Sequence, residues 1–267
     1  MRNIRAVFTK QLISYIKNPA RWGAPLTFLL LPFILVMMNP DVNRAVMPIQ
    51  FVIMFVGISM IGGSAGILME DKQTMNLRFM GMAGVKPWQY LLSTCAVLLV
   101  VSLGILFLFG LIMGHSGQIM INFLIVTMLG SACSMLLGIT IGLSKLAPFT
   151  MIIGLLLGVG PVLAADFGIE ALSNVFYYTH TYQINLALRD GVIGLPGTTN
   201  LYELVGDHNL ATMDDLRVFL RELNTPRDLA VLPMGAIRVM LINMGVILLA
   251  FVAMNMRYGL DGERLGR

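Results

Sequence analysis

The sequence predicts an all-α polytopic membrane protein, and its composition and apolar runs carry that prediction. Of the 267 residues, 57% are hydrophobic and only 12% are charged, whereas soluble domains carry about 25% charged residues. Several apolar runs reach about 20 residues, the length of helix that crosses a bilayer core. A chain in lipid must pair its own backbone groups, so these runs are expected to be helices.

We expect six membrane-spanning helices. Their ranges are Trp22–Met38, Val46–Met69, Tyr90–Gly114, Ile119–Leu143, Pro148–Ala165 and Gly235–Met256. The first is short and contains Pro25 and Pro32, and the fifth carries GVGP near its end. The chain thus divides into five parts. They are residues 1–21, a span region 22–165 that is interrupted by a polar helical segment at 70–89, a segment 166–234, the last span 235–256 and a tail 257–267.

Basic residues place both chain ends on the cytoplasmic side. Cytoplasmic loops carry an excess of Lys and Arg, and most of the 18 bases flank the spans on one side. These bases are Arg2, Arg5, Lys10, Lys17, Arg21, Lys72, Arg78, Lys86, Lys145, Arg257, Arg264 and Arg267. They lie beside the spans rather than on one patch, so no nucleic-acid partner is expected.

The first 21 residues are predicted to form an amphipathic helix in the inner interface. Apolar residues recur at helical spacing from Ile4 to Ile16, while Lys10 and Lys17 lie on the other side. Asn18-Pro19 is expected to end the helix. The alternative is a basic tail that only sets the topology.

Residues 166–234 form an outer segment that is too long for a bare connection. It opens with LSNVFYYTHTYQINLALRDGV, which is aromatic and suits short helices dipping into the outer leaflet. Thr212 and Asp215 make a capping-box pattern before an amphipathic stretch that reaches Leu223. We expect an extracellular helical cap, acting either as a lid or partner-binding site or as packing alone.

Several kinds of chemistry are missing from the sequence. No lysine lies in the G-x-x-x-x-G-K-[ST] pattern that binds nucleotide phosphates, so the chain alone is not expected to hydrolyse ATP. The spans hold almost no ionisable residues of the kind that ion-coupled transport uses. His115, His180 and His208 lack metal-ligand spacing and are read as polar surface groups. Cys95 and Cys133 lie in spans and are read as packing residues.

Small residues gather in spans two, four and five. Gly154 and Gly158 have the spacing that lets two helix backbones approach closely, and Gly160-Pro161 is expected to break the helix near the outer leaflet. Span two also carries small residues, among them Gly62 and Gly66. These residues indicate either ordinary packing within the chain or the wall of a translocation path.

A polar island separates spans two and three. The stretch GILMEDKQTMNLRFMGMAGVKPWQYLLST from Gly66 has an acidic start at Glu70, an expected helix of mixed character at Thr74–Met82 and a turn with a proline before span three. This island, the basic first helix and the aromatic segment after span five make the chain resemble the permease subunit of type-2 ABC exporters. The resemblance covers nearly the whole chain in layout, although segment 166–234 is longer than in compact members.

The resemblance implies a coupling helix that docks on a separate ATPase, with the first helix touching the same subunit and spans two and five lining a path. The expected ATPase-coupling residues are Glu70, Asp71, Lys72, Met75, Leu77, Arg78, Phe79, Met80 and Met82. The residues expected to matter in the N-terminal helix are Arg2, Arg5, Phe8 and Lys10. The expected path or gate residues are Gly62, Gly66, Gly154, Gly158, Pro161, Phe176, Tyr177, Tyr178 and Tyr182.

The expected function follows from this resemblance. The chain would pair with a second, identical permease and with two ABC ATPase subunits in a bacterial cell membrane, and it would export an amphiphilic drug, lipid-linked molecule or peptide. It would bind no cofactor itself, because ATP and Mg²⁺ would sit on the ATPases. The alternatives are a non-ATP channel, or a binding or immunity protein that uses its cap. An island that only joins two spans would favour them.

Overall fold

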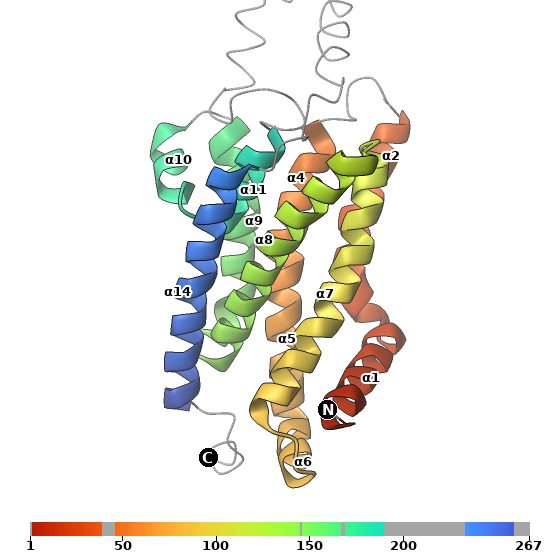
Figure 1. Ribbon diagram of the computed structural model, residues 1–267, viewed down its shortest axis with the longest axis vertical. Coiled ribbons are helices and arrows are strands. Elements are labelled where there is room, and N and C mark those ends of the chain that lie inside the picture. The colour runs from red at the N-terminus through yellow and green to blue at the C-terminus, as the bar shows by residue number, and fades with distance from the viewer. Residues whose placement is uncertain (1, 39–45, 145, 167–168, 190–232, 259–267) are drawn as a thin grey trace, which may run out of the picture.

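The computed structural model describes residues 2–38, 46–144, 146–166, 169–189 and 233–258. Within these ranges all regular structure is helical, and the long helices run side by side in one bundle (Figure 1). Helix α6 (Asn76–Met82) marks one end of the bundle, and helices α10 (Glu170–Phe176) and α11 (His180–Leu188) mark the other. We call these the α6 end and the α11 end.

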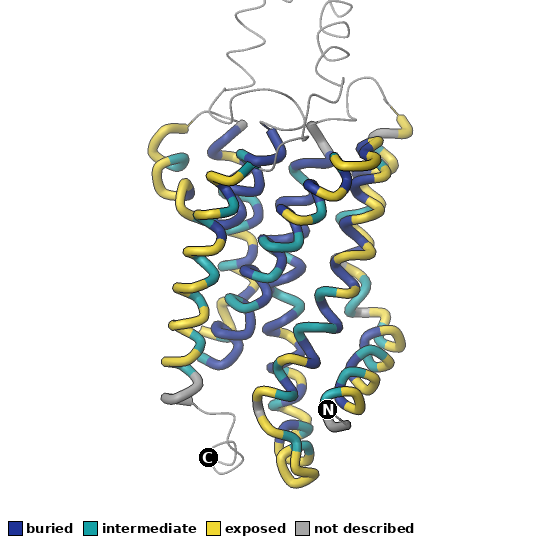
Figure 2. The backbone as a smooth tube through the Cα atoms, viewed as in Figure 1, coloured by how far each residue is buried: buried dark blue, intermediate teal, exposed yellow. Residues whose placement is uncertain are grey.

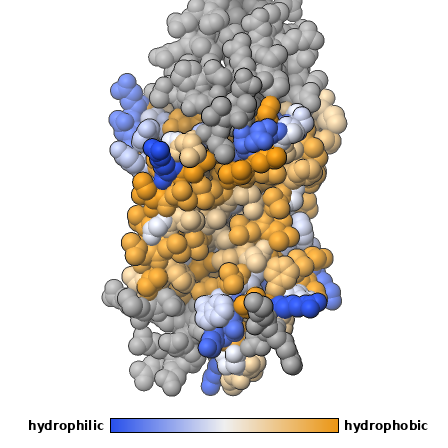
Figure 3. Space-filling view, viewed as in Figure 1, coloured by the Kyte–Doolittle hydropathy of each residue, from blue (hydrophilic) through white to orange (hydrophobic). Residues whose placement is uncertain are grey.

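Five helical stretches are long and apolar enough to cross a membrane, which indicates a membrane protein. The first combines α4 (Val46–Met54), the π-helix η1 (Phe55–Met60) and α5 (Ile61–Gln73). The others are α7 (Pro87–Ile112), α8 (Gly117–Leu143), α9 (Thr150–Asp166) with the short turn η2 (Ala147–Phe149) before it, and α14 (Met234–Tyr258). On the face shown in Figure 3, an apolar band crosses the middle of the molecule, and polar groups gather toward its ends.

The predicted first span lies in α2 (Pro19–Met38). Its apolar part, Arg21–Leu35, is shorter than the five stretches above. Helix α1 (Arg2–Lys17) precedes it, ends just before Asn18 and Pro19, and packs along α7 near the α6 end (Figure 1). Val7, Gln11 and Tyr15 form its buried face.

Within the polar island at 70–89, the helix expected at Thr74–Met82 is present as α6. Helix α5 continues to Gln73, and α6 is only seven residues long. Helix α7 begins at Pro87, where a proline costs no backbone hydrogen bond. In the segment 166–234 the structure places α10 and α11, whereas the helix predicted from Thr212 to Leu223 lies outside the described residues.

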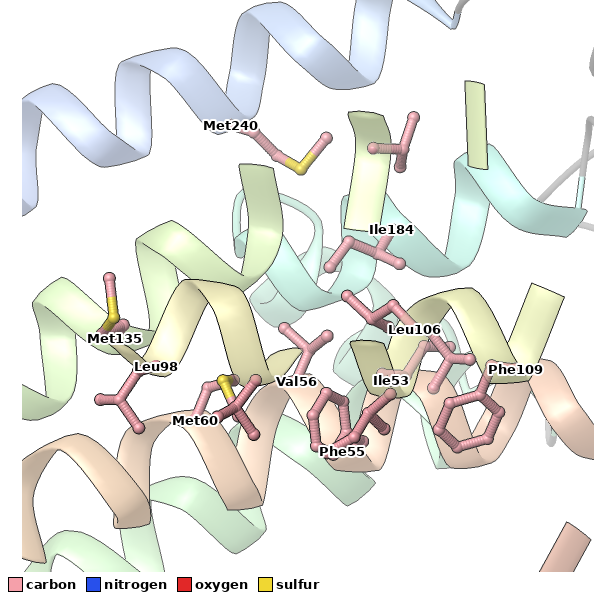
Figure 4. Close-up of a cluster of buried hydrophobic side chains, with 14 of the residues drawn as sticks. Ile53, Phe55, Val56, Met60, Leu98, Leu106, Phe109, Met135, Ile184 and Met240 are labelled. Atoms are coloured by element: carbon pink, nitrogen blue, oxygen red, sulfur yellow. The ribbon is translucent and has the colours of Figure 1, made fainter. Parts of the chain in front are cut away.

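Helix α8 is the centre of the bundle and packs against α5, α14, α7 and α11. Figure 2 shows burial concentrated on α5 and α8, while α14 exposes most of its surface. A cluster of apolar side chains fills the space between these helices, with Phe55 and Phe109 at one side and Ile184 and Met240 reaching in from α11 and α14 (Figure 4).

Glycines allow two of these contacts. A Cβ added to Gly57 of η1 would lie 2.5 Å from the Cα of Gly158 in α9. A Cβ added to Gly138 of α8 would lie 2.3 Å from the carbonyl oxygen of Ile61. In lipid, where apolar burial does not drive helices together, such close backbone packing holds the bundle.

Candidate functional site

A cluster of polar side chains lies at the α6 end, where two tight turns join α6 to its neighbouring spans. Met75 takes a left-handed conformation, with φ of 56°, between α5 and α6, and Gly84 has φ of 75° between α6 and α7. The amide of Val85 donates to the carbonyl of Met80 at 2.9 Å. The amide of Lys86 donates to the side chain of Gln89 at 3.0 Å. Helix α6 is therefore joined to α5 and α7 without slack.

One buried carboxylate ties four helices together. Asp71, near the end of α5, is 5% exposed. Its Oδ2 accepts hydrogen bonds from Gln11 of α1 at 2.8 Å and from the hydroxyl of Tyr90 in α7 at 2.6 Å. Its Oδ1 accepts one from Asn76 of α6 at 3.1 Å. A buried carboxylate needs such donors. Because they come from α1, α6 and α7, a displacement of α6 would strain its bond to α5 and, through Asp71, the bonds to α1 and α7.

Two further contacts lie beside Asp71. The Arg21 guanidinium pairs with Glu70 at 2.5 Å and donates to the hydroxyl of Ser14 at 3.4 Å. Lys72 donates to the carbonyl of Gly142, at the end of α8, at 3.0 Å. The first contact joins α2 to α5, and the second joins α5 to α8.

The expected coupling residues divide into an exposed and an internal group. Exposed side chains at the tip are Met75, Phe79 and Met82, with exposed fractions of 53%, 62% and 68%. Arg78 and Glu70 are also exposed, whereas Met80 and Lys72 are half-buried. Asp71 and Leu77 are buried within the chain, so they hold the tip in place and do not face a partner.

The expected residues of the first helix are also split. Arg5 and Lys10 are exposed, and Phe8 is half-buried against the core. The side chain of Arg2 lies outside the described residues. The hydroxyl of Ser93 in α7 donates to the carbonyl of Ile4 at 3.1 Å. This bond joins α1 to α7, while Gln11 joins α1 to Asp71 of α5.

A cavity of about 310 Å³ lies next to this polar cluster, between α1, α2, the η1–α5 stretch and α9. Its wall includes Gly62 and Gly66, two of the expected path residues, as well as Ser59 and Met151. Arg21 and Glu70 also line it. The cavity therefore passes from a charged rim to an apolar interior.

The expected residues of span five lie mainly in helix contacts. Gly154 and Gly158 are buried against η1, where a Cβ on Gly158 would meet the side chain of Ile58 at 2.8 Å. The carbonyl of Pro161 accepts a hydrogen bond from Asn185 of α11 at 3.2 Å. Their close packing against η1 and α11 corresponds to the packing alternative for these residues.

The aromatic residues form the tip of a helical hairpin at the α11 end. Helices α10 and α11 turn back on each other at Tyr177–Thr179. Phe176 and Tyr182 are buried, with Phe176 filling the space that a side chain at Gly160 would need. Tyr177 and Tyr178 are exposed, with their rings 5.2 Å apart. Asn243 of α14 donates to the carbonyl of Tyr178 at 2.6 Å.

The prediction that the histidines are surface groups is wrong for two of them. His180 is 3% exposed, and its Nε2 lies 2.6 Å from the Oγ of Ser134 in α8. His115, between α7 and α8, is 4% exposed, and burial lowers its pKa to about 4. His208 lies outside the described residues. A serine beside a histidine can act as a nucleophile, but the Ser134 and His180 side chains are both buried inside the bundle.

Sequence reasoning missed Gln11, Asn76 and Tyr90, and it read Ser59 as an ordinary span serine bonded to a helix carbonyl or across a helix contact, whereas its hydroxyl has no partner among the described residues. Gln11 had a readable signal, because it interrupts the apolar face of the first helix between Val7 and Tyr15. Ser59 had none, since a π-helix leaves no clear pattern in the residues that form it. Within the described residues, no group of three or more His, Cys, Asp or Glu side chains could hold a metal ion.

Comparison of the chain with protein-family models, with curated proteins and with solved structures gives no match.

Proposed function

We propose that this chain is the permease subunit of a type-2 ABC exporter. It would act with a second copy of itself and two ATPase subunits and move an amphiphilic or hydrophobic substrate outward. The α6 end would face the cytoplasm, with both chain ends on that side. Helix α2 would also cross the membrane, as the first of six spans. ATP and Mg²⁺ would be bound by the ATPases.

The observation that carries this proposal is the construction of α6. It is a short helix at one end of the bundle (Figure 1), and the apolar side chains of Met75, Phe79 and Met82 at this tip are exposed. Exposed apolar side chains beside charged ones are typical of a protein interface. Met80 and Arg78 complete this surface.

The internal contacts of α6 explain how force on that surface would reach the spans. Asp71 links the helix to α1, α5 and α7, and Lys72 links α5 to α8. A partner that pushes α6 would tilt these helices together, because packed helices shift as units between discrete arrangements. A loop that only connected two spans would not need a buried carboxylate with three donors.

The path would run beside α5 and α9. Gly62 and Gly66 line the cavity at the α6 end, and the α10–α11 hairpin with Phe176 and Tyr182 covers the α11 end of α9. Gly154, Gly158 and Pro161 would then set how closely α9 can approach η1 and the hairpin. Tyr177 and Tyr178 would lie at the exit.

Co-purification of the chain with ABC ATPase subunits from its native membrane tests the proposal. The double variant Phe79→Asp with Met82→Asp places charge on the exposed tip without touching the core, so we expect it to lose the ATPase and transport. Phe149→Asp in η2 is the matched control, since Phe149 is 52% exposed but lies outside α6. A double variant that keeps both its ATPase and transport would overturn the proposal, as would a lone chain that transports fully.

A further inference from the structure

The cavity beside α5 has two chemically different ends. At its rim Arg21 and Glu70 form an ion pair in which the Arg21 side chain is 11% and the Glu70 side chain 47% exposed. Tyr15 lines the same rim and donates to the carbonyl of Arg21 at 3.3 Å. Farther along the η1–α5 stretch the wall is apolar, formed by residues such as Pro25 and Met151.

Ser59 lies in this apolar wall without a hydrogen-bond partner among the described residues. It is 6% exposed, and leaving a buried hydroxyl unpaired destabilises a fold. Other hydroxyls in the spans bond back to a carbonyl of their own helix, as Ser64 does to Ile61 and Thr127 does to Phe123. Ser59 sits in the π-helix, a local irregularity that is frequent at functional sites.

Three glycines leave room between the rim and Ser59. Gly62, Gly63 and Gly66 line the cavity. A Cβ added at Gly63 or Gly66 would meet no heavy atom within 4 Å. The free hydroxyl and the open space beside it point to a ligand that carries a hydrogen-bond acceptor into the cavity.

The ion pair at the rim selects the charge of that ligand. An anionic head would be repelled by Glu70, and a cationic head would be repelled by Arg21. A head that carries both charges can place its cation on Glu70 and its anion on Arg21. The Arg21 guanidinium has five donors, and among the described residues it uses two of them, in its bonds to Ser14 and Glu70. A primary ammonium suits Glu70 better than a quaternary one because it retains N–H donors.

The distance between the two polar ends fits one class of membrane component. From Ser59 to Glu70 the helix rises about 16 Å at 1.5 Å per residue. An extended ammonium–phosphate head with its glycerol ester spans about 12 Å at roughly 1.25 Å per bond, and a hydrogen bond at each end adds about 3 Å. The ester carbonyl of such a lipid therefore reaches the hydroxyl of Ser59.

We propose that this cavity binds a phospholipid from the leaflet at the α6 end, with a primary ammonium and a phosphate in its head group. The ammonium donates to Glu70, the phosphate accepts from Arg21, and an ester carbonyl accepts from Ser59. All of these groups belong to one chain. The binding therefore needs neither an ATPase nor a second permease, and it can fail or hold independently of the proposed function.

Native mass spectrometry of the purified chain in detergent tests this site. The probes are phosphatidylethanolamine, phosphatidylcholine and phosphatidylglycerol with identical acyl chains. We expect phosphatidylethanolamine to bind about tenfold more tightly than the other two, because only its head offers both N–H donors to Glu70 and a phosphate to Arg21. Ser59→Ala is expected to weaken its binding.

Gly63→Leu separates this cavity from the rest of the lipid-facing surface. The new side chain would occupy the space beside Ser59, so the preference for phosphatidylethanolamine should disappear. Gly104→Leu is the matched control, because Gly104 in α7 is exposed, has open space around it and lies outside the cavity. Equal binding of the three lipids, or a preference that survives Gly63→Leu, would overturn the proposal. Displacement of the lipid by soluble phosphoethanolamine at equal concentration would also overturn it, since the head group alone would then suffice.

Discussion

At the α6 end, polar side chains of α1, α6 and α7 converge on one acceptor, whereas at the α11 end they reach separate backbone carbonyls. Asp71 receives Gln11, Asn76 and Tyr90. Asn185 of α11 donates to the carbonyl of Pro161 in α9, and Asn243 of α14 donates to the carbonyl of Tyr178 at the tip of the hairpin. The side-chain hydrogen bonds of the α6 end thus share one acceptor, whereas those of the α11 end have separate acceptors. One substitution should release several helices at the first end, while each substitution should act alone at the second.

The largest effect is expected from Asp71→Leu. The change leaves Gln11, Asn76 and Tyr90 without their acceptor, and several buried unpaired donors together cost about 3 kcal/mol or more. Helix α1 should also come loose from α7. The measurements are the thermal unfolding midpoint in detergent and the rate of tryptic cleavage at Lys10 and Lys17.

Asp71→Asn is the control for this prediction. Its amide keeps the shape of the side chain and one oxygen that can accept from Tyr90 and Gln11, so we expect a smaller loss and an α1 that remains resistant to trypsin. If Asp71→Leu left both the midpoint and the cleavage rate unchanged, one carboxylate would not be holding the α6 end.

The second-largest effect is expected at the contact between η1 and α9, which lies between the two ends of the bundle. Gly57→Ala would place its Cβ 2.5 Å from the backbone of Gly158, so η1 and α9 must separate. We expect a loss of about 2 kcal/mol, as for other overpacked contacts. Gly104→Ala, which has no heavy atom within 4 Å of its new Cβ, should change stability by less than about 0.5 kcal/mol. Equal thermal midpoints for the two variants would contradict the close contact.

Hydropathy predicted the positions of the long helices well because it is a property of neighbouring residues. Helix α8 begins at Gly117 where the sequence indicated Ile119, and both end at Leu143. The short α6 lies where a helix is expected at Thr74–Met82, but the sequence does not show the left-handed turn at Met75 that separates it from α5. Asp71 was assigned to a docking surface because its burial depends on Gln11, which lies 60 positions away in the chain. No local pattern reports such a contact.

The comparison of the two ends can be sharpened by testing additivity. Asn185→Ala and Asn243→Ala each remove one hydrogen bond to a different carbonyl, so each should cost about 1 kcal/mol. Because the two sites share no acceptor, the double variant should equal their sum within about 0.5 kcal/mol. Gln11→Leu with Tyr90→Phe should instead cost more than the sum, since both donors serve one buried carboxylate. Denaturation of the single and double variants measures both couplings, and equal additivity at the two ends would remove the distinction between them.

The smallest effect concerns pH at the α11 end of the bundle, where His115 joins α7 to α8. Burial lowers the pKa of His115 to about 4 from an ordinary value of 6.5, and its ring nitrogens have no partner among the described residues. As the pH falls below 6.5, the unfolded chain gains a proton that the folded chain refuses until about pH 4. Stability should therefore fall as the pH drops through this window.

His115→Leu removes that proton site and the unpaired nitrogens together. The wild-type thermal midpoint should drop by a few degrees between about pH 7 and about pH 5, and the variant should drop by less. Part of the dependence should remain, because burial also lowers the pKa of His180 to about 4. An identical drop in both proteins would mean that His115 is not titrating in this range. The polar groups of the α11 end would then contribute to stability through their carbonyl contacts and not through charge.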